Sequence, residues 1–507
     1  MLASLRSAAV FGVDAVPVVV EVDVSWGMPI FTMVGLPDAS VRESRDRVRS
    51  AIRNCGFPFP EHRVTVNLAP ADIRKAGASY DLPIALGILA ASGVITLDNP
   101  DRVVLLGELS LDGTIQAVRG ALPVAVSARR EGKVAVLLPA ANAPEARVVS
   151  GLRVLPASSL REAVEVLTRP LITADEAPVP LSATAAREQR STEDYTDVCG
   201  QAMAKRALEI AAAGGHNVLL LGPPGGGKTM MARRLPGILP ALTFDEALEC
   251  TSIHSVAGTL PAGSSLMHCR PFRAPHHTIS EVALVGGGSN PRPGEISLAH
   301  NGVLFLDELP EFSRGALEAL RQPLEEGRVS VSRAARTVSF PSRFVLIGAM
   351  NPCPCGFHGD DRRQCRCSPG QLERYAARIS GPLKDRLDLF VDVPSAALGM
   401  REGEPEEPSE AIAARVRRAR AKQSTRFVGA RLNAHMDSAE LRQHCGLERR
   451  GATLLRKAVQ KLNVSARGHD RVLRVSRTIA DLEESANIEA EHVAEALQFR
   501  AVQMGSM

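Results

Sequence analysis

The segment that most restricts what this chain can fold into is residues 218–235. Val218–Leu221 are all apolar and predict a buried strand, while Met230–Leu235 predict a helix. The string between them comprises Gly222, Pro223, Pro224, Gly225, Gly226, Gly227, Lys228 and Thr229. A glycine-rich turn between strand and helix points backbone N–H groups at phosphate oxygens. The pattern therefore predicts an α/β fold that binds a nucleotide through Lys228, with the Thr229 hydroxyl on Mg²⁺.

A second apolar run carries the acidic partners of such a loop. Val303–Leu306 predicts another buried strand, which Asp307 and Glu308 follow directly. We expect Asp307 to hold the Mg²⁺ shell and Glu308 to orient and polarise the attacking water. The two segments together are far more specific than the glycine-rich string alone. They predict a protein that binds ATP with Mg²⁺ and hydrolyses it.

Two further polar residues fit the same catalytic site. Asn351 follows the apolar strand predicted at Phe344–Ala349, so its amide can sense the γ-phosphate; the alternative is a turn-forming role before Pro352. Arg386 precedes another apolar run. In ring ATPases an arginine at this place reaches the nucleotide of the neighbouring subunit, with an effect on the order of 10³–10⁵ in rate. The alternative for Arg386 is a surface ion pair.

Composition and patterning divide the chain into three folded segments. With 507 residues, 45% of them hydrophobic and 23% charged, the chain has the balance of a globular protein rather than a disordered one. We expect domains at 1–170, 194–393 and 411–507, joined by linkers at 171–193 and 394–410. In the first domain, alternating valines at 16–24 predict a half-buried strand, and Asp38 is expected to cap a helix.

The sequence offers no sign of membrane insertion or secretion. Its apolar runs fall short of the ~20 residues that a spanning helix needs. The first ten residues lack the apolar core and cleavage-like pattern of a secretory signal. We therefore expect a cytoplasmic protein without a membrane partner.

Four of the nine cysteines lie within one short segment. They are Cys353, Cys355, Cys365 and Cys367, two close pairs separated by nine residues. Four thiolates on a short loop can enclose a tetrahedral Zn²⁺, and a reducing compartment favours metal over disulfides. We predict a structural zinc site, with His358 as a possible substitute ligand. The other five cysteines are scattered and are expected to be packing residues.

Several longer strings identify a family. They are Val34–Asp38, Val66–Asp72, Arg270–His277, Pro293–His300 and Asn351–Gly356. Across nearly the whole chain these strings resemble the magnesium-chelatase-like AAA+ ATPases of the ComM/YifB group. The resemblance implies an N-terminal Lon-protease-like domain of the ribosomal S5 domain 2 type. It also implies an AAA+ core of magnesium-chelatase type and a C-terminal helical lid.

The resemblance also implies an activity. Proteins of this group are expected to form homo-hexamers in the presence of nucleotide or DNA. They are expected to act as helicases that drive branch migration of recombination intermediates in natural transformation. The implied partner is branched or duplex DNA, bound without regard to sequence.

Particular residues take roles from the resemblance. Asn351 corresponds to sensor 1 and Arg386 to the finger that acts in trans. Within the string 471–481, similar to the sensor-2 helix, we take Arg474 as the arginine that acts in cis, with Arg477 as the alternative. The segment 327–340 resembles a hairpin that projects into a ring's pore. Arg333 and Arg336 at its tip would contact DNA phosphates; an ordinary exposed turn is the alternative.

Other functions remain open at this stage. Ser79 resembles the serine of a Lon-type peptidase, but Leu122 stands where the lysine base is expected. Because a serine without a base is a weak nucleophile, we expect a proteolytically inactive domain. The main alternative to a DNA motor is a chelatase-type remodeller of a protein partner or a metal-insertion complex. A nucleotide-switched scaffold without turnover is the third alternative.

Overall fold

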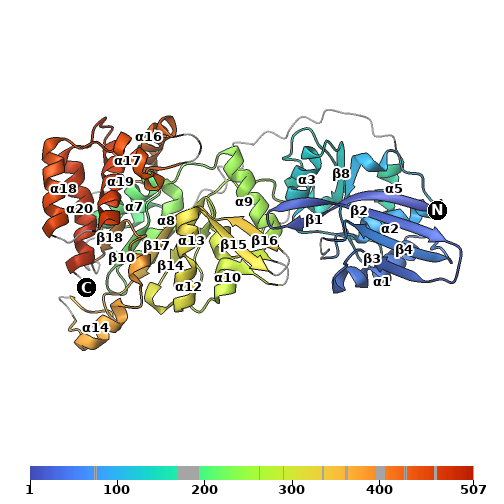
Figure 1. Cartoon of the computed structure of the whole chain (residues 1–507), viewed down its shortest axis with the longest axis horizontal. Helices are drawn as coiled ribbons and strands as arrows, with labels where there is room; N and C mark the ends of the chain where they lie inside the picture. Colours follow the sequence, from blue (N-terminus) through green and yellow to red (C-terminus); the bar gives the residue numbers. More distant parts are fainter. Residues whose placement is uncertain are drawn as a thin grey trace.

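The computed structural model describes residues 1–72, 75, 77–169, 193–261, 263–288, 291–333, 336–359, 363–394, 406–427, 429, 431–461 and 465–505. Along the long axis of the molecule an N-terminal lobe, a central sheet and a C-terminal group of helices follow one another (Figure 1). The mixed α/β class predicted from the sequence is confirmed. Of the predicted linkers 171–193 and 394–410, residues 171–192 and 395–405 lie outside the described part.

The N-terminal lobe is built on a seven-stranded sheet in the order β3-β4-β2-β1-β5-β8-β9. Its strands are β1 (Leu2–Phe11), β2 (Asp14–Ser25), β3 (Phe31–Val34), β4 (Arg63–Ala69), β5 (Val103–Leu105), β8 (Ala135–Pro139) and β9 (Arg153–Ala157). The β1–β2 and β2–β4 pairs are antiparallel, and the others are parallel. The even-numbered Val18, Val20 and Val22 are fully buried, as the alternation predicts.

Helices and one short ribbon complete this lobe. They are α1 (Ala39–Asn54), α2 (Asp81–Ala91), α3 (Ala121–Arg130), α4 (Ala143–Ala146) and α5 (Leu160–Thr168), with the ribbon formed by β6 (Glu108–Leu109) and β7 (Ile115–Gln116). The predicted cap is present, because the Asp38 carboxylate accepts a hydrogen bond of 2.9 Å from the Val41 N–H.

The central sheet has five parallel strands in the order β11-β14-β17-β10-β18. The strands are β10 (Val218–Leu221), β11 (Phe272–Arg273), β14 (Gly302–Leu306), β17 (Phe344–Met350) and β18 (Leu389–Asp392). Val218 and Leu220 bury one face under α7 (Ala202–Gly214) and α8 (Lys228–Ile238), while Leu219 and Leu221 bury the other. Because the strands are parallel, their carboxyl ends meet at one edge of the sheet and their amino ends at the opposite edge.

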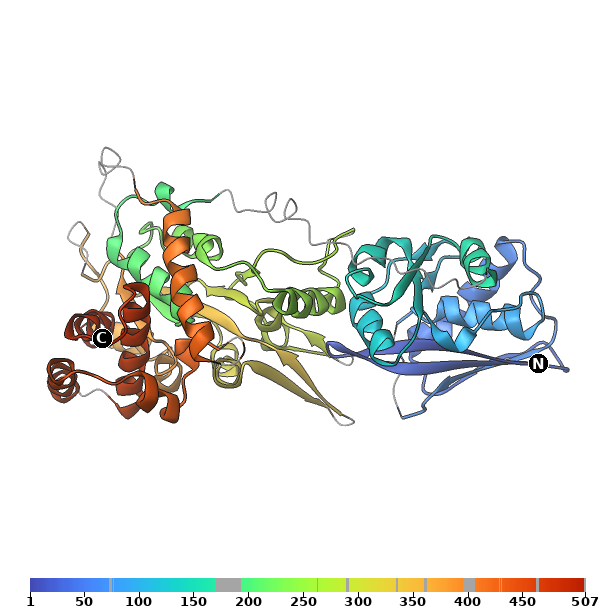
Figure 2. The same cartoon turned by 90° about the horizontal axis from the view of Figure 1, so that it is seen from above.

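The remaining central elements surround this sheet. They are α9 (Phe244–Ala257), α10 (Glu281–Val285), α11 (Glu295–Leu298), α12 (Arg314–Ala319), α13 (Arg321–Glu326), α14 (Pro369–Ala376), α15 (Gly381–Lys384), β12 (Gly286–Gly287) and β13 (Arg292–Pro293). The predicted hairpin consists of β15 (Arg328–Arg333) and β16 (Arg336–Pro341), paired antiparallel. Figure 2 shows it extending toward the N-terminal lobe.

The N-terminal lobe contacts the central part at two places. Helix α3 packs on α9, and the Gly120 N–H at its start donates a hydrogen bond of 3.2 Å to the Ser255 carbonyl. The β1–β2 turn meets the hairpin so closely that a Cβ on Gly12 would lie 2.7 Å from a Val338 methyl. The lobe is therefore attached to the central part by direct contacts as well as by the chain itself.

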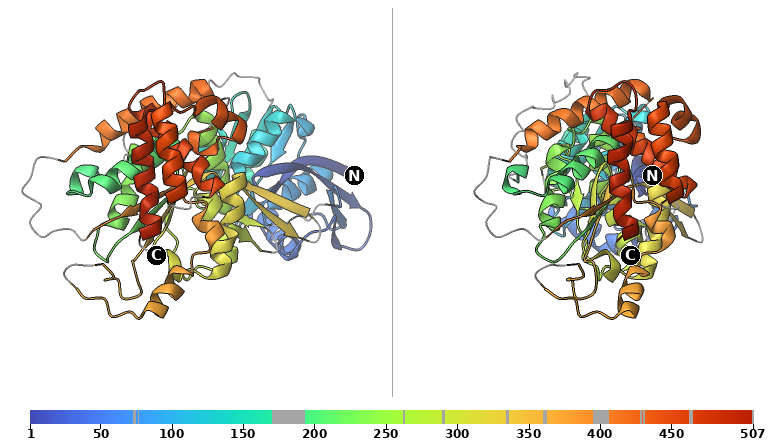
Figure 3. Two further views of the ribbon diagram at one scale, coloured as in Figure 1. Left: turned by 60° about the vertical axis from the view of Figure 1, so that its left-hand side comes forward. Right: turned by 90° about the vertical axis from the view of Figure 1, so that its left-hand side faces the viewer.

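The C-terminal group consists of helices, as the sequence indicates. They are α16 (Ser409–Arg426), α17 (Ser438–His444), α18 (Arg449–Lys461), α19 (Ala466–Leu482) and α20 (Ala490–Gly505). Ile412 and Val416 of α16 are buried in one core with α7 and α19. Figure 3 shows these helices at the end of the molecule away from the N-terminal lobe. Across the described residues, no helix has both the length and the apolar character required to cross a bilayer.

Candidate nucleotide site

The glycine-rich string forms the turn from β10 into α8. Gly225 and Gly227 have φ angles of +80° and +82°, the left-handed region that glycine enters without strain. A Cβ on Gly222 would lie 2.0 Å from the Val393 carbonyl, so no larger residue fits there. The turn therefore has the tight backbone that a phosphate-binding loop needs.

Lys228 lies inside this turn and is only 7% exposed. Its Nζ donates to the carbonyls of Gly222 (2.5 Å) and Pro223 (2.9 Å) and to Asn351 Oδ1 (3.2 Å). Burial lowers the pKa of Lys228, while the Asp307 carboxylate acts in the opposite direction. These three oxygens hold the Lys228 ammonium in the turn, where phosphate oxygens of a bound nucleotide could accept its hydrogen bonds instead.

The predicted residues from three strands meet at the carboxyl edge of the sheet. The Thr229 hydroxyl donates to Asp307 Oδ2 at 2.7 Å, and Asp307 Oδ1 accepts from the Glu308 N–H at 2.9 Å. Since carboxylate and hydroxyl oxygens are ligands that Mg²⁺ prefers, Thr229 and Asp307 can share one ion. The structure thus brings together Lys228, Thr229, Asp307, Glu308 and Asn351.

Glu308 has a neighbour to which sequence reasoning gave no role. His277 Nδ1 lies 3.1 Å from Glu308 Oε2, and the His277 side chain is 29% exposed. Glu308 itself has a φ of +51°, a left-handed conformation that costs a non-glycine residue energy. His277 follows β11, the strand next to β14. The sequence feature that could have revealed it is the pair of successive histidines, His276 and His277, after a strand.

Arg386 lies at the opposite, amino edge of the sheet. It precedes β18, just as Asn217 precedes β10 and Arg343 precedes β17. A cavity of about 540 Å³ opens here. Its charged lining consists of Arg343, Arg386, Arg431, Arg467, Arg471 and Arg474, with Glu325, Glu326, Asp385, Asp388 and Asp470. Arg386 donates a hydrogen bond to Glu325 in this chain.

Asp388 anchors the C-terminal helices to this edge. Arg471 of α19 donates to it, and so does the Asn217 N–H at 3.0 Å. Burial raises the pKa of the Asp388 carboxyl, but the Arg471 guanidinium and His216 outweigh this effect, so the pKa lies well below its usual range. The ionised carboxylate therefore ties α19 to the amino ends of β10 and β18.

The structure does not bring Arg474, which was predicted to act in cis, to the nucleotide site of its own chain. Arg474 lines the amino-edge cavity with Arg386, and its Nη2 donates to the Met436 carbonyl at 2.7 Å. The four residues of β10 alone separate this edge from Lys228 by about 13 Å. Arg474 therefore faces away from the nucleotide site of its own chain.

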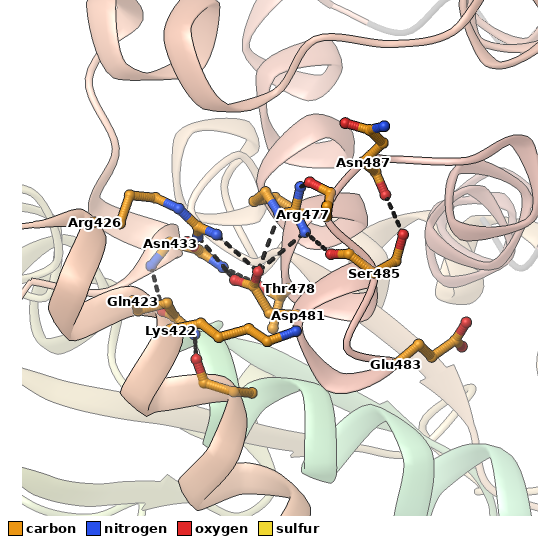
Figure 4. Close-up of polar contacts among 12 residues, drawn as sticks. Lys422, Gln423, Arg426, Asn433, Arg477, Thr478, Asp481, Glu483, Ser485 and Asn487 are labelled. Atoms are coloured by element: carbon orange, nitrogen blue, oxygen red, sulfur yellow. Dashed lines mark hydrogen bonds and ion pairs between the residues drawn. The ribbon is translucent and has the colours of Figure 1, made fainter.

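Arg477, the alternative, lies within the C-terminal helices. Its guanidinium is 4% exposed and donates to Asp481 Oδ1 and to the carbonyls of Ser485 and Ala486. Arg426 pairs with the same Asp481 at 2.8 Å (Figure 4). Since these partners satisfy it inside the helical group, Arg477 is a structural residue and Arg474 is the one directed at the cavity.

The four clustered cysteines come together, with all of their sulfur atoms within 4.8 Å of one another. All nine cysteines of the chain are described, and none forms a disulfide. The cluster begins two residues after Asn351. It is compatible with the predicted zinc site.

Other predicted residues lie apart from the nucleotide site. Arg333 and Arg336 pair with each other in the register at the end of the hairpin, and residues 334–335 between them lie outside the described part. In the N-terminal lobe Leu122 is fully buried, and the Ser79 carbonyl accepts from the Gly107 N–H at 2.9 Å. The Lys75 amine, four residues before Ser79, donates to the Pro70 carbonyl.

Comparison with known proteins agrees with this architecture. The family model "Magnesium chelatase, subunit ChlI" matches residues 194–400. "Subunit ChlI of Mg-chelatase" matches 20–142, and the C-terminal model of the same subunit matches 406–500. Fold and family models thus define an AAA+ protein of magnesium-chelatase type, a class that indicates ATPase activity with ATP and Mg²⁺.

Several relatives match over nearly their full length. The "Uncharacterized protein YifB" of Escherichia coli K12 is 45% identical over 99% of this chain and 97% of that protein. The "Competence protein ComM" of Haemophilus influenzae is 45% identical over 99% of this chain and 98% of that protein. A "Magnesium-chelatase 67 kDa subunit" of Chlorobaculum parvum is 28% identical over 31% of this chain and 23% of its own length. The chain belongs to the ComM/YifB family of magnesium-chelatase-like proteins.

Proposed function

We propose that this protein is an ATP-hydrolysing motor that works as a ring, a homo-hexamer, and moves on DNA. The observation that carries the proposal is the distribution of charge on the two edges of one sheet. The carboxyl edge holds the lysine and carboxylates that suit a nucleotide of the same chain. The amino edge carries arginines that cannot reach that nucleotide.

The amino-edge arginines have unused hydrogen-bonding capacity. Within the described part of the chain, the buried Nε atoms of Arg386, Arg471 and Arg474 have no hydrogen-bond partner. Since a buried unpaired donor is costly, these guanidinium groups would gain hydrogen bonds by turning toward an anionic ligand in the cavity. The triphosphate of a neighbouring subunit fits this requirement. On this proposal Arg386 and Arg474 both act in trans, and the ring is needed for catalysis.

The DNA part of the proposal rests on the relatives and on one structural element. The Haemophilus relative carries the name of a competence protein, so a role in natural transformation, with branch migration of recombination intermediates, is the activity we propose. The β15–β16 hairpin, with Arg333 and Arg336 at its end, is our candidate for DNA phosphate contact. We propose that residues 1–170 form a Lon-protease-like domain that supports assembly rather than proteolysis.

The test is the steady-state ATPase rate without DNA and with single-stranded, duplex and four-way-junction DNA, at two salt concentrations. Phosphate contacts predict stimulation that weakens as salt rises. Replacing Arg333 and Arg336 together by alanine should remove stimulation and spare the basal rate. A higher rate on junctions than on duplexes supports branch migration. Equal rates with and without every DNA would overturn the DNA proposal.

The second candidate is a chelatase-type remodeller of a protein partner or metal-insertion complex. It is favoured by the family models, all three of which are named for a magnesium chelatase subunit. An ATPase rate that ignores DNA but responds to a protein partner would support this candidate.

A further inference from the structure

We infer that the cysteine cluster binds one Zn²⁺ and that the loaded loop braces the phosphate-binding loop, so that zinc occupancy sets the affinity for ATP. The inference adds a metal-dependent control to the nucleotide site proposed above and rests on that site. It is carried by three observations: the geometry of the sulfur atoms, the donors that face them, and the contact of the loop with Pro224.

The sulfur atoms already have the spacing of a tetrahedral site. Cys353 Sγ lies 3.3 Å from Cys355 Sγ and 3.7 Å from Cys365 Sγ, and Cys355 Sγ lies 3.6 Å from Cys365 Sγ. Four sulfur atoms about 2.3 Å from one Zn²⁺ are about 3.8 Å apart. A disulfide needs sulfur atoms about 2.05 Å apart, which none of these pairs approaches.

Backbone donors point at the sulfur atoms. The His358 N–H donates to Cys353 Sγ at 3.3 Å, and the Cys367 N–H donates to Cys365 Sγ at 3.4 Å. Such donors stabilise the negative charge of thiolates and orient them toward a metal. Cys353 is fully buried, so the negative charge of its thiolate would have to be balanced by a nearby cation. The fourfold thiolate set leaves zinc no open position for catalysis.

The loop then touches the nucleotide site from two directions. Cys353 lies two residues after Asn351, whose side chain accepts a hydrogen bond from Lys228. Gly356, inside the cluster, has a φ of +85°, and a Cβ on it would lie 2.9 Å from Cδ of Pro224. Pro224 belongs to the phosphate-binding turn, and its ring cannot rotate away. Fixing the cysteines therefore fixes both Asn351 and one wall of the turn.

Without zinc the four thiols lose their common partner. The described residues 353–359 and 363–367 then lose the cross-link that joins them, and the support they give to Asn351 and Pro224 weakens. Since a preorganised loop binds phosphate at a lower entropic cost, affinity for ATP should fall. Hydrolysis would fall as a consequence.

The first measurement is the zinc content of the intact chain, purified without chelator, by plasma mass spectrometry. We expect about one zinc per chain in the wild type and almost none in the Cys365→Ser, Cys367→Ser double variant, since thiolates are the ligands. Cys199→Ser, outside the cluster, is the control and should keep its zinc. A wild-type chain that stays zinc-free after incubation with ZnCl₂ would overturn the site.

The second measurement separates bracing from metal binding. Gly356→Ala keeps every ligand but pushes on Pro224, so it should retain zinc while the Kd for a fluorescent ATP analogue rises about tenfold. Gly359 has a similar φ of +78°, and a Cβ there meets no atom within 4 Å. Gly359→Ala therefore carries the same backbone strain without the contact and should keep both zinc and affinity.

The outcomes distinguish the two proposals. A rise in Kd for the double variant and for Gly356→Ala, but not for Gly359→Ala, supports the brace. Zinc loss with an unchanged Kd leaves the metal site standing and overturns the brace. A wild-type chain that binds zinc but no ATP overturns the nucleotide site itself, and with it the proposed function.

Discussion

The two edges of the central sheet differ in how they are assembled. At the carboxyl edge Asp307 and Glu308 directly follow β14, and Lys228 and Thr229 follow the glycine-rich turn after β10, so each pair comes from one short run of sequence. At the amino edge the arginines come from the residues before β17 and β18, from Arg431 after α16, and from the distant helix α19. The functional residues of the carboxyl edge are therefore neighbours in the sequence. The amino edge exists only once the C-terminal helices have docked on the sheet.

The difference between the two edges indicates which half of the proposed catalytic site one chain contains. The carboxyl edge has internal partners for its charges, such as the Thr229–Asp307 hydrogen bond. The amino edge has buried guanidinium nitrogens that the described residues leave unpaired. If the two edges are halves of one site that closes between subunits, substitutions at either edge should stop turnover. Only substitutions at opposite edges should complement each other.

The largest effect is expected for Arg386→Ala. An arginine that stabilises transition-state charge across an interface contributes on the order of 10³–10⁵ in rate, so turnover should almost vanish. Steady-state ATPase measurement checks this. The control is Arg378→Ala, since Arg378 is 51% exposed and pairs with Glu311 away from the cavity.

Mixing two inactive variants tests more strictly whether the two edges form one site between subunits. Arg386→Ala subunits keep an intact carboxyl edge, and Lys228→Ala subunits keep an intact amino edge. Mixed rings should therefore regain part of the activity that neither variant has alone. Failure to regain activity at every mixing ratio contradicts a shared site.

Glu308→Gln should produce the next largest loss, at the carboxyl edge. The amide keeps the shape but cannot polarise water, so turnover should fall about 10²–10⁴-fold. ATP binding should remain, because Lys228 and Thr229 are untouched. A nucleotide-binding assay beside the ATPase assay separates the two effects, and unchanged turnover removes Glu308 from the mechanism.

Arg474 and Arg477 offer a comparison within one helix. Arg474→Ala should lower turnover about tenfold to a hundredfold, since it removes one of several cations at the cavity, and leave the thermal unfolding midpoint nearly unchanged. Arg477→Ala should instead lower the free energy of unfolding by about 3 kcal/mol, because it breaks a buried pair with Asp481. If instead Arg477→Ala lowered turnover and Arg474→Ala lowered stability, the catalytic role would belong to Arg477.

The sequence predicted the carboxyl edge because each of its parts has a local signature. Glycines, a lysine and paired carboxylates next to apolar strands keep their meaning without knowledge of the tertiary structure. At the amino edge Arg386 has such a signature, because it precedes an apolar strand, but the arginines of α19 do not. The three-residue spacing of Arg474 and Arg477 puts them near one another on α19, but only packing decides that one faces the cavity and the other Asp481.

The lobe at the N-terminus shows the same limit. The alternation of Val18, Val20 and Val22 marks β2, and Asp38 marks the start of α1. The long strand β1 was not predicted, because its polar and apolar residues do not alternate cleanly. Nor does the sequence reveal that the Gly12 turn meets the hairpin, since 326 positions separate it from Val338 and nothing local connects them.

The smallest effect on turnover is expected for substitutions of His277. They test whether the carboxyl edge contains a functional residue that the sequence did not predict. His277 touches Glu308 rather than any group expected on the nucleotide, so it is a positioning residue. His277→Ala should lower kcat about tenfold with little change in KM, since Glu308 would lose the partner that holds its carboxylate. His277→Gln can still donate a hydrogen bond and should recover part of kcat, whereas a purely steric role predicts no recovery. Because Glu308→Gln has no carboxylate to orient, adding His277→Ala to it should cost nothing further; independent losses in the double variant would mean that His277 acts elsewhere.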